Sequence, residues 1–151
     1  MHKLTSVLLV LGTGATFTSQ ICLGAPKAVH VQSDPMRVIY QLDGDNKDTT
    51  TALHQIKNQL TADPASKIIV LAIGKSVRFV VRGSKTEGGY PYALMIEDLQ
   101  QMGARIEVCG TTMHALRIAP KQLDDGVVVV PTGMAELARR QWRDGYVYIK
   151  P

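Results

Sequence analysis

Residues 106–114 read Ile-Glu-Val-Cys-Gly-Thr-Thr-Met-His. This stretch begins with a pattern that favours a strand, breaks at Gly110, and resumes with two hydroxyl residues that can open a helix. This order places Cys109 at the carboxyl end of a strand, which is where open α/β sheets bind their ligands. Backbone N–H groups of the following helix would point toward the sulfur, which favours a thiolate over a thiol.

Predicted strands alternate with predicted helices along the rest of the chain. Residues 67–73, Lys-Ile-Ile-Val-Leu-Ala-Ile, and the four valines at 127–130 are apolar without alternation, as expected for strands buried on both faces. Residues 37–42 and 146–149 are the other predicted strands. Alternation of strands with helices predicts a parallel sheet between helical layers. The sequence therefore predicts one three-layer α/β/α domain with a mainly parallel five-stranded sheet.

Apolar residues at helical spacing indicate where the helices lie. We expect one helix to begin near Asp48 or Thr49, either of which can cap it, and others to occupy residues 91–102, 113–118 and 134–142. In the last of these, Arg139, Arg140 and Arg143 are expected to form a solvated face.

Composition and charge exclude some classes of partner. The chain has 151 residues, of which 45% are hydrophobic and 20% charged, and its formal net charge is +4. This balance is typical of a globular domain. So small a basic excess, without a basic tract interleaved with aromatic residues, argues against nucleic-acid binding. The turn Asp43-Gly44-Asp45-Asn46 is interpreted as solvated, and we expect neither a metal site nor a bound cofactor.

The first residues have the pattern of an export signal. Lys3 precedes a short apolar run from Leu4 to Leu11, which is too short to span a bilayer. We predict a signal peptide at residues 1–24, a linker at 25–35 and the folded domain at 36–151. A protein of this kind would be periplasmic or secreted, with no stable membrane insertion after cleavage. Because Cys22 would be removed, the mature chain would keep Cys109 as its single cysteine.

Three segments carry a resemblance to a known family. They are Val-Cys-Gly-Thr-Thr-Met at 108–113, Val-Val-Val-Val-Pro-Thr-Gly at 127–133, and the ending Gly-Tyr-Val-Tyr-Ile-Lys-Pro at 145–151. Together they resemble the DsrE/DsrF-like family, in its small exported single-domain branch. The family usually has asparagine two residues after the cysteine, where this chain has Thr111. It often has His-Gly after the second strand, where this chain has Ile73 and Gly74.

The resemblance implies a fold, an assembly and a chemistry. The fold is the three-layer α/β arrangement, and the assembly is a homo- or hetero-oligomer. The chemistry is a sulfur relay, in which Cys109 holds a persulfide and exchanges sulfur with a donor or acceptor protein. The residues expected to support the thiolate are Gly110, Thr111, Thr112 and His114. The residues expected to line the site are Gly74, Lys75 and Ser76.

Alternatives to a reactive thiol stay open at the level of sequence. Free cysteine is among the most buried residue types, so Cys109 could be structural and the protein a non-catalytic oligomeric binding module. Cys109, Met113 and His114 also offer soft ligands that suit Cu(I). Whether the protein is an enzyme of the sulfurtransferase type is therefore left undecided.

Overall fold

The computed structural model describes residues 34–151. The predicted signal peptide and nearly all of the predicted linker lie outside the described residues, so export stays a prediction. Within residues 34–151, none of the helices combines the length and the apolar character needed to cross a bilayer.

Five strands form one sheet in the order β4-β3-β2-β1-β5, and every neighbouring pair is parallel. The predicted α/β fold is confirmed, and the sheet is parallel throughout rather than mainly parallel. The apolar run at 67–73 becomes β2, an inner strand between β1 and β3, which explains its lack of alternation. The strands are β1 (Arg37–Leu42), β2 (Lys67–Ala72), β3 (Arg105–Cys109), β4 (Val128–Val130) and β5 (Val147–Ile149).

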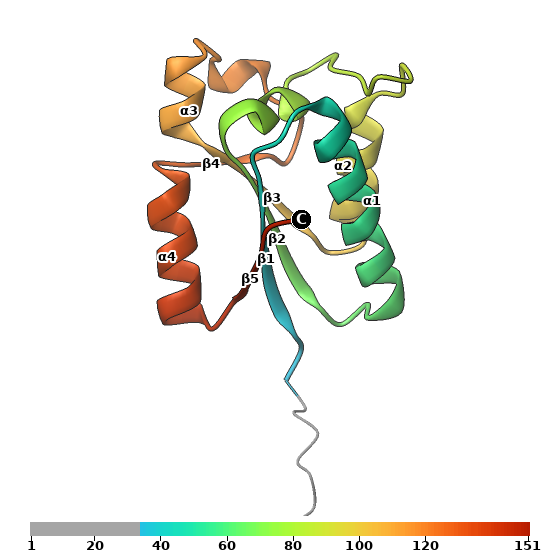
Figure 1. The fold of residues 1–151 in the computed structure, drawn as a ribbon, viewed down its shortest axis with the longest axis vertical. Coiled ribbons are helices and arrows are strands. Elements are labelled where there is room, and N and C mark those ends of the chain that lie inside the picture. Colours follow the sequence, from blue (N-terminus) through green and yellow to red (C-terminus); the bar gives the residue numbers. More distant parts are fainter. Residues whose placement is uncertain (1–33) are drawn as a thin grey trace, which may run out of the picture. The chain divides into compact units, whose positions relative to one another are not determined.

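Helices cover both faces of the sheet unequally. Figure 1 shows α1 and α2 on one side of the strands and α4 on the other, with α3 near the carboxyl ends of the strands. A single long helix on one face follows from the strand order, because only the connection from β4 to β5 runs back across the sheet. The helices are α1 (Asn46–Ala62), η1 (Gly74–Val80, 3₁₀), α2 (Tyr92–Gln101), α3 (Gly110–Ala115), η2 (Pro120–Gln122, 3₁₀) and α4 (Gly133–Asp144).

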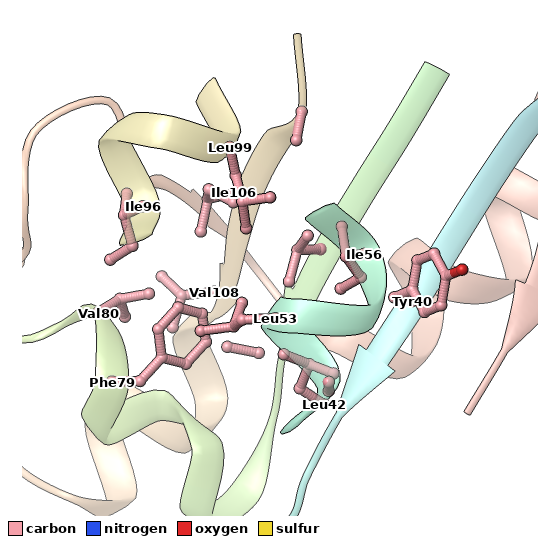
Figure 2. Packing of buried hydrophobic residues seen from close by; sticks show 14 of the residues in the cluster. Tyr40, Leu42, Leu53, Ile56, Phe79, Val80, Ile96, Leu99, Ile106 and Val108 are labelled. Carbon is pink, nitrogen blue, oxygen red and sulfur yellow. The ribbon is translucent and has the colours of Figure 1, made fainter. Parts of the chain in front are cut away.

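The two faces carry hydrophobic clusters of different size. The larger one joins β1, β2 and β3 to α1 and α2 and includes Leu53, Phe79 and Ile106 (Figure 2). The smaller one lies under α4, where Leu137 packs on Ile39, Ile69, Leu71 and Val130. Since α4 has few apolar contacts, polar contacts matter more for its position.

Three local predictions are corrected by the structure. Helix α1 begins earlier than expected, because the Asp45 carboxylate accepts the N–H of Asp48 and caps the helix. Helix α3 begins directly at Gly110, with no break after β3. The valine strand β4 lies at the edge of the sheet, so Val129 is 40% exposed and the expected burial on both sides is wrong.

Candidate active site

Cys109 ends β3 at the carboxyl edge of the sheet, beside the end of β4. Its sulfur lies beneath the first turn of α4, because the N–H of Gly133 donates a hydrogen bond to Sγ at 3.2 Å. Gly133 is the first residue of that helix. The residue is only 4% exposed, so the thiol lies just inside the surface. The predicted position at a strand end is thus accompanied by a donor from a second helix, which the sequence did not indicate.

Two glycines allow this close approach. A Cβ at Gly133 would lie 2.7 Å from Cδ1 of Ile73 and 3.3 Å from Cβ of Cys109. A Cβ at Gly110 would lie 3.0 Å from the carbonyl oxygen of Val130 and 3.2 Å from that of Pro131. A side chain at Gly110 would crowd the end of β4, and one at Gly133 would crowd Ile73 and Cys109. The two glycines therefore let α3 and α4 begin close to Cys109.

The surroundings of the sulfur favour the charged form. Burial raises the pKa of the Cys109 thiol, but hydrogen bonding from the Thr112 hydroxyl and from the N–H groups of Gly133, Thr112 and Thr111 outweighs burial. The pKa therefore lies below the ordinary thiol value. The N–H of Thr111 is shared, since it also donates to the carbonyl of Pro131 at 3.2 Å. Fixed dipoles thus favour the thiolate form of a sulfur that is little exposed.

The structure brings several predicted site residues to one place. Gly74 begins η1, and its N–H donates a long hydrogen bond of 3.5 Å to the hydroxyl oxygen of Thr112. Gly74, Lys75, Thr111 and Thr112 line a common pocket of about 390 Å³ at the carboxyl edge of the sheet. The loop after β2 and the helix after β3 therefore meet beside Cys109.

Two predicted residues are placed differently. Ser76 is 2% exposed and bonds to the Thr49 hydroxyl at 2.9 Å and to the carbonyl of Gly44 at 3.0 Å. It ties η1 to the start of α1 and is not among the residues lining the pocket beside Thr112. His114 is exposed on the last turn of α3. No described contact joins its side chain to the sulfur.

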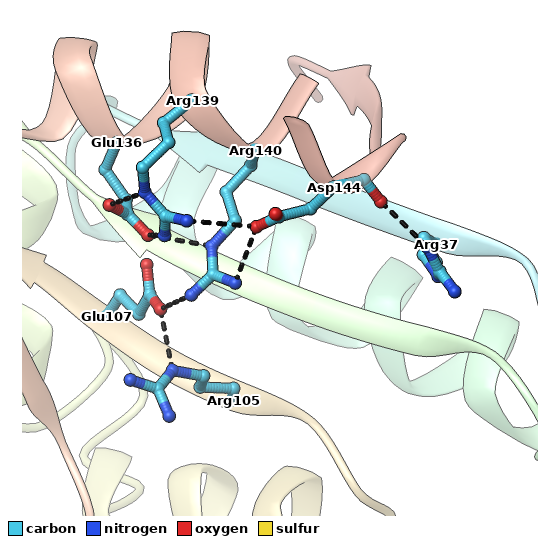
Figure 3. A network of polar contacts seen from close by, with 7 residues as sticks. All are labelled: Arg37, Arg105, Glu107, Glu136, Arg139, Arg140 and Asp144. Atoms are coloured by element: carbon cyan, nitrogen blue, oxygen red, sulfur yellow. Dashed lines mark hydrogen bonds and ion pairs between the residues drawn. The ribbon is translucent and has the colours of Figure 1, made fainter. Parts of the chain in front are cut away.

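A buried ionic network holds α4 against β3 (Figure 3). Glu107 is fully buried, and its Oε1 accepts hydrogen bonds from Arg105 Nε at 2.7 Å and from Arg140 Nη2 at 3.0 Å. Arg140 also donates to Glu136 at 2.7 Å and to Asp144 at 3.1 Å. The expectation of a solvated arginine face is wrong for Arg140, whose side chain is 18% exposed.

The network matters for the site because Glu107 lies two residues before Cys109 on the same face of β3. By holding α4, the pair of Glu107 and Arg140 also holds the N–H of Gly133 over the sulfur. The signal in the sequence was a glutamate inside an otherwise apolar strand, which needs a buried partner. That partner stands 33 residues later, so sequence spacing alone could not name it.

The soft ligands considered for Cu(I) do not converge in the structure. Met113 is 3% exposed and packs in the large cluster on the α1 and α2 face, whereas the sulfur of Cys109 faces Gly133 of α4. Among residues 34–151, no group of three or more His, Cys, Asp or Glu side chains is placed to hold a metal ion.

The model of the DsrE/DsrF-like family matches residues 36–151. The chain belongs to this family. The family is associated with sulfur relay, and the match covers the strand end, both glycines and the whole of α4. No functionally curated protein matches the sequence.

Solved structures support the fold. A protein of unknown function from Methanobacterium thermoautotrophicum is 26% identical, with a TM-score of 0.67 over 77% of this chain and 99% of its own. The ychN protein of E. coli is 20% identical, with a TM-score of 0.65 over 77% and 99%. A conserved protein of unknown function from Bacteroides thetaiotaomicron is 18% identical, with a TM-score of 0.53 over 76% and 94%.

Proposed function

We propose that this member of the DsrE/DsrF-like family carries sulfur as a persulfide on Cys109. The observation that carries the proposal is the convergence of hydrogen-bond donors on one sulfur at the carboxyl edge of the sheet, which lowers the pKa of the thiol. A structural cysteine in an apolar core would have its pKa raised instead. Membership in a family associated with sulfur relay gives this geometry its chemical context.

Loading would follow ordinary thiol exchange. The Cys109 thiolate attacks the terminal sulfur of a donor persulfide RS–SH, a new S–S bond forms, and RS⁻ leaves with the electron pair of the broken bond. Delivery reverses the roles, since an acceptor thiolate attacks the terminal sulfur and Cys109 leaves as a thiolate. A thiol of low pKa is the better leaving group, so the donors around Sγ would assist the second step as well as the first.

The family's site includes asparagine where this chain has Thr111, and here Thr112 gives the side-chain contribution. Its hydroxyl lowers the pKa of Cys109 more than any backbone group does. Thr111 instead donates its hydroxyl to the carbonyl of Pro131 at 3.1 Å, which ties α3 to the end of β4. We propose that Thr112 supports the thiolate directly and that Thr111 supports it through the position of α3.

The test is the intact mass after treatment with inorganic polysulfide, on full-length protein carrying Cys22→Ser so that one thiol is present. One added sulfur atom that further replacement Cys109→Ser abolishes is the expected result. An unchanged mass, or the same increment in the Cys109→Ser variant, would contradict the proposal. Circular dichroism of both proteins controls for loss of the fold.

The alternative is a binding module with an unreactive cysteine. The low exposure of Cys109 is the observation that favours it. Alkylation of the native protein separates the two, because an unreactive cysteine would be labelled far more slowly in the native state than in denaturant. Titration with Cu(I) against a competing chelator tests the soft-metal form of this alternative, and the placement of Met113 predicts no retention.

For the assembly, we propose self-association through the outer face of α4. Met134, Ala138 and Trp142 recur every four residues on that face, and Trp142 is 90% exposed while Met134 is 59% exposed. A stripe of this kind on a helix is typical of an interface. A twofold pairing of two copies would place small Ala138 at the crossing, with Trp142 of one copy near the partner's Met134.

A further inference from the structure

The pocket beside Cys109 carries a charge that the sulfur chemistry described above does not use. Its wall on the η1 side presents Lys75 and Arg78, and its wall on the α3 side presents Thr111 and Thr112. Lys75 and Arg78 are both exposed, and neither forms an ion pair with another residue of the described part of the chain. The pocket volume of about 390 Å³ suits a small molecule.

Thr112 connects this pocket to the sulfur. It lines the pocket, and its side chain is also the group that lowers the pKa of Cys109 most. Cys109 does not line the pocket, so Thr112 is the residue through which a ligand there would approach the sulfur. A sulfur that is 4% exposed favours a small donor over the persulfide of a folded protein, because a small molecule needs less displacement of Thr112 to reach it.

We propose that this pocket binds a small anionic sulfur compound, with its negative group on Lys75 and Arg78 and its sulfane sulfur directed past Thr112 toward Cys109. The proposal rests on the persulfide function and names its donor class. Thiosulfate illustrates the balance of the step. The thiolate attacks the outer sulfur, the S–S bond of thiosulfate breaks, and sulfite leaves with the electron pair, so that the total charge is −3 on both sides.

A pair of alkylating reagents tests the electrostatic part without any sulfur transfer. Iodoacetate is an anion and iodoacetamide is neutral, and both react with thiolates. The rate with iodoacetate divided by that with iodoacetamide, measured on full-length Cys22→Ser protein and compared with free glutathione, reports the potential at Cys109. Coulomb's law for a unit charge about 6 Å away in water gives roughly a threefold change in this ratio for each cation.

The expected result is a ratio that exceeds that of glutathione, falls with rising salt, and falls about threefold in each of Lys75→Gln and Arg78→Gln. Lys67→Gln is the matched control, since Lys67 is an exposed lysine at the opposite end of β2 and should leave the ratio unchanged. A ratio equal to that of glutathione, or one that neither pocket variant changes, would overturn the anion pocket.

Donor assays then separate the two proposals. Thiosulfate and inorganic polysulfide are compared as separate donors, by the initial rate at which Cys109 gains one sulfur. A loss of rate in Lys75→Gln and Arg78→Gln with either anion supports the pocket and identifies its source of sulfur. Loading that is unaffected by both variants overturns the pocket while leaving the carrier function in place. If alkylation is charge-selective but neither thiosulfate nor polysulfide adds sulfur to Cys109, the assigned class of donor is wrong. The absence of sulfur transfer from polysulfide would also count against the proposed function as a sulfur carrier.

Discussion

Replacement of Thr112 by valine should change the reactivity of Cys109 in opposite directions at low and at high pH. Valine keeps the shape of threonine and removes the hydroxyl, which is the largest of the groups that lower the pKa of the thiol. A hydrogen bond to a charged acceptor contributes about 1.5–3 kcal/mol. We take the lower end, because the sulfur keeps its three N–H donors when the hydroxyl is removed.

The magnitude follows from two opposing effects. A loss of about 1.5 kcal/mol lowers the ratio of thiolate to thiol about tenfold, so the midpoint of the pH–rate profile should rise by about 1 pH unit. The more basic thiolate is also the better nucleophile, with a Brønsted coefficient of about 0.4–0.5, so its intrinsic rate should rise about threefold. Alkylation of the variant should therefore be about threefold slower below both midpoints and about threefold faster above them.

The assay is alkylation by iodoacetamide across pH, followed by intact mass on full-length Cys22→Ser protein. Thr111→Val is the comparison, because the Thr111 hydroxyl affects the site only through its bond to the Pro131 carbonyl, and its removal should raise the midpoint by less than that of Thr112 does. Profiles for Thr112→Val and the parent that do not cross, or equal shifts in the two valine variants, would refute the idea that the Thr112 hydroxyl stabilises the thiolate.

Three further predictions follow from the same structure. The folded pKa of Cys109 lies below the ordinary thiol value of 9.0, so its contribution to stability is present above that value and is lost as pH falls through the folded pKa. Chemical unfolding under reducing conditions should therefore show a free energy of unfolding that rises with pH over this range in the parent and not in Cys109→Ala. Arg140→Met should lower the free energy of unfolding in a urea titration by about 3 kcal/mol, because it leaves fully buried Glu107 with one partner fewer. Lys57→Met, which removes the exposed ion pair with Asp98, should lower it far less. Trp142→Glu should reduce the mass measured by sedimentation, and an unchanged mass would count against association through α4.

Much of the fold could be predicted because the strands of a parallel sheet carry their own signal. The run at 67–73 is apolar without alternation and became β2, and residues 105–109 became β3, both with bounds close to those expected. The valine run was harder, because its composition resembles that of an inner strand although β4 lies at the sheet edge. Strand order depends on contacts between distant segments, which local composition does not encode.

For the candidate site too, local patterns could be predicted from the sequence, whereas contacts between distant segments could not. The position of Cys109 at a strand end, with hydroxyl residues opening the next helix, is a local pattern and was predicted. Gly133 and Glu107 were missed because each acts through a neighbour in space. Gly133, at the start of α4, donates to Cys109 on β3, and Glu107 is paired with Arg140 on α4. Arg78 was missed for the same reason, because it joins the pocket only when η1 lies beside α3.

The strand order explains why two helix beginnings meet at one sulfur. The connection after β3 packs on the α1 and α2 face through Met113 and Leu123, while α4 after β4 packs on the opposite face through Leu137. Adjacent parallel strands whose connections leave to opposite faces open a crevice at their carboxyl ends. Cys109 lies at that point, and Gly110 and Gly133 let both connections begin close to it. The donors around the sulfur are therefore a consequence of the topology, and we propose that Thr112, Lys75 and Arg78 are the side chains through which this chain adapts the crevice to its donor of sulfur.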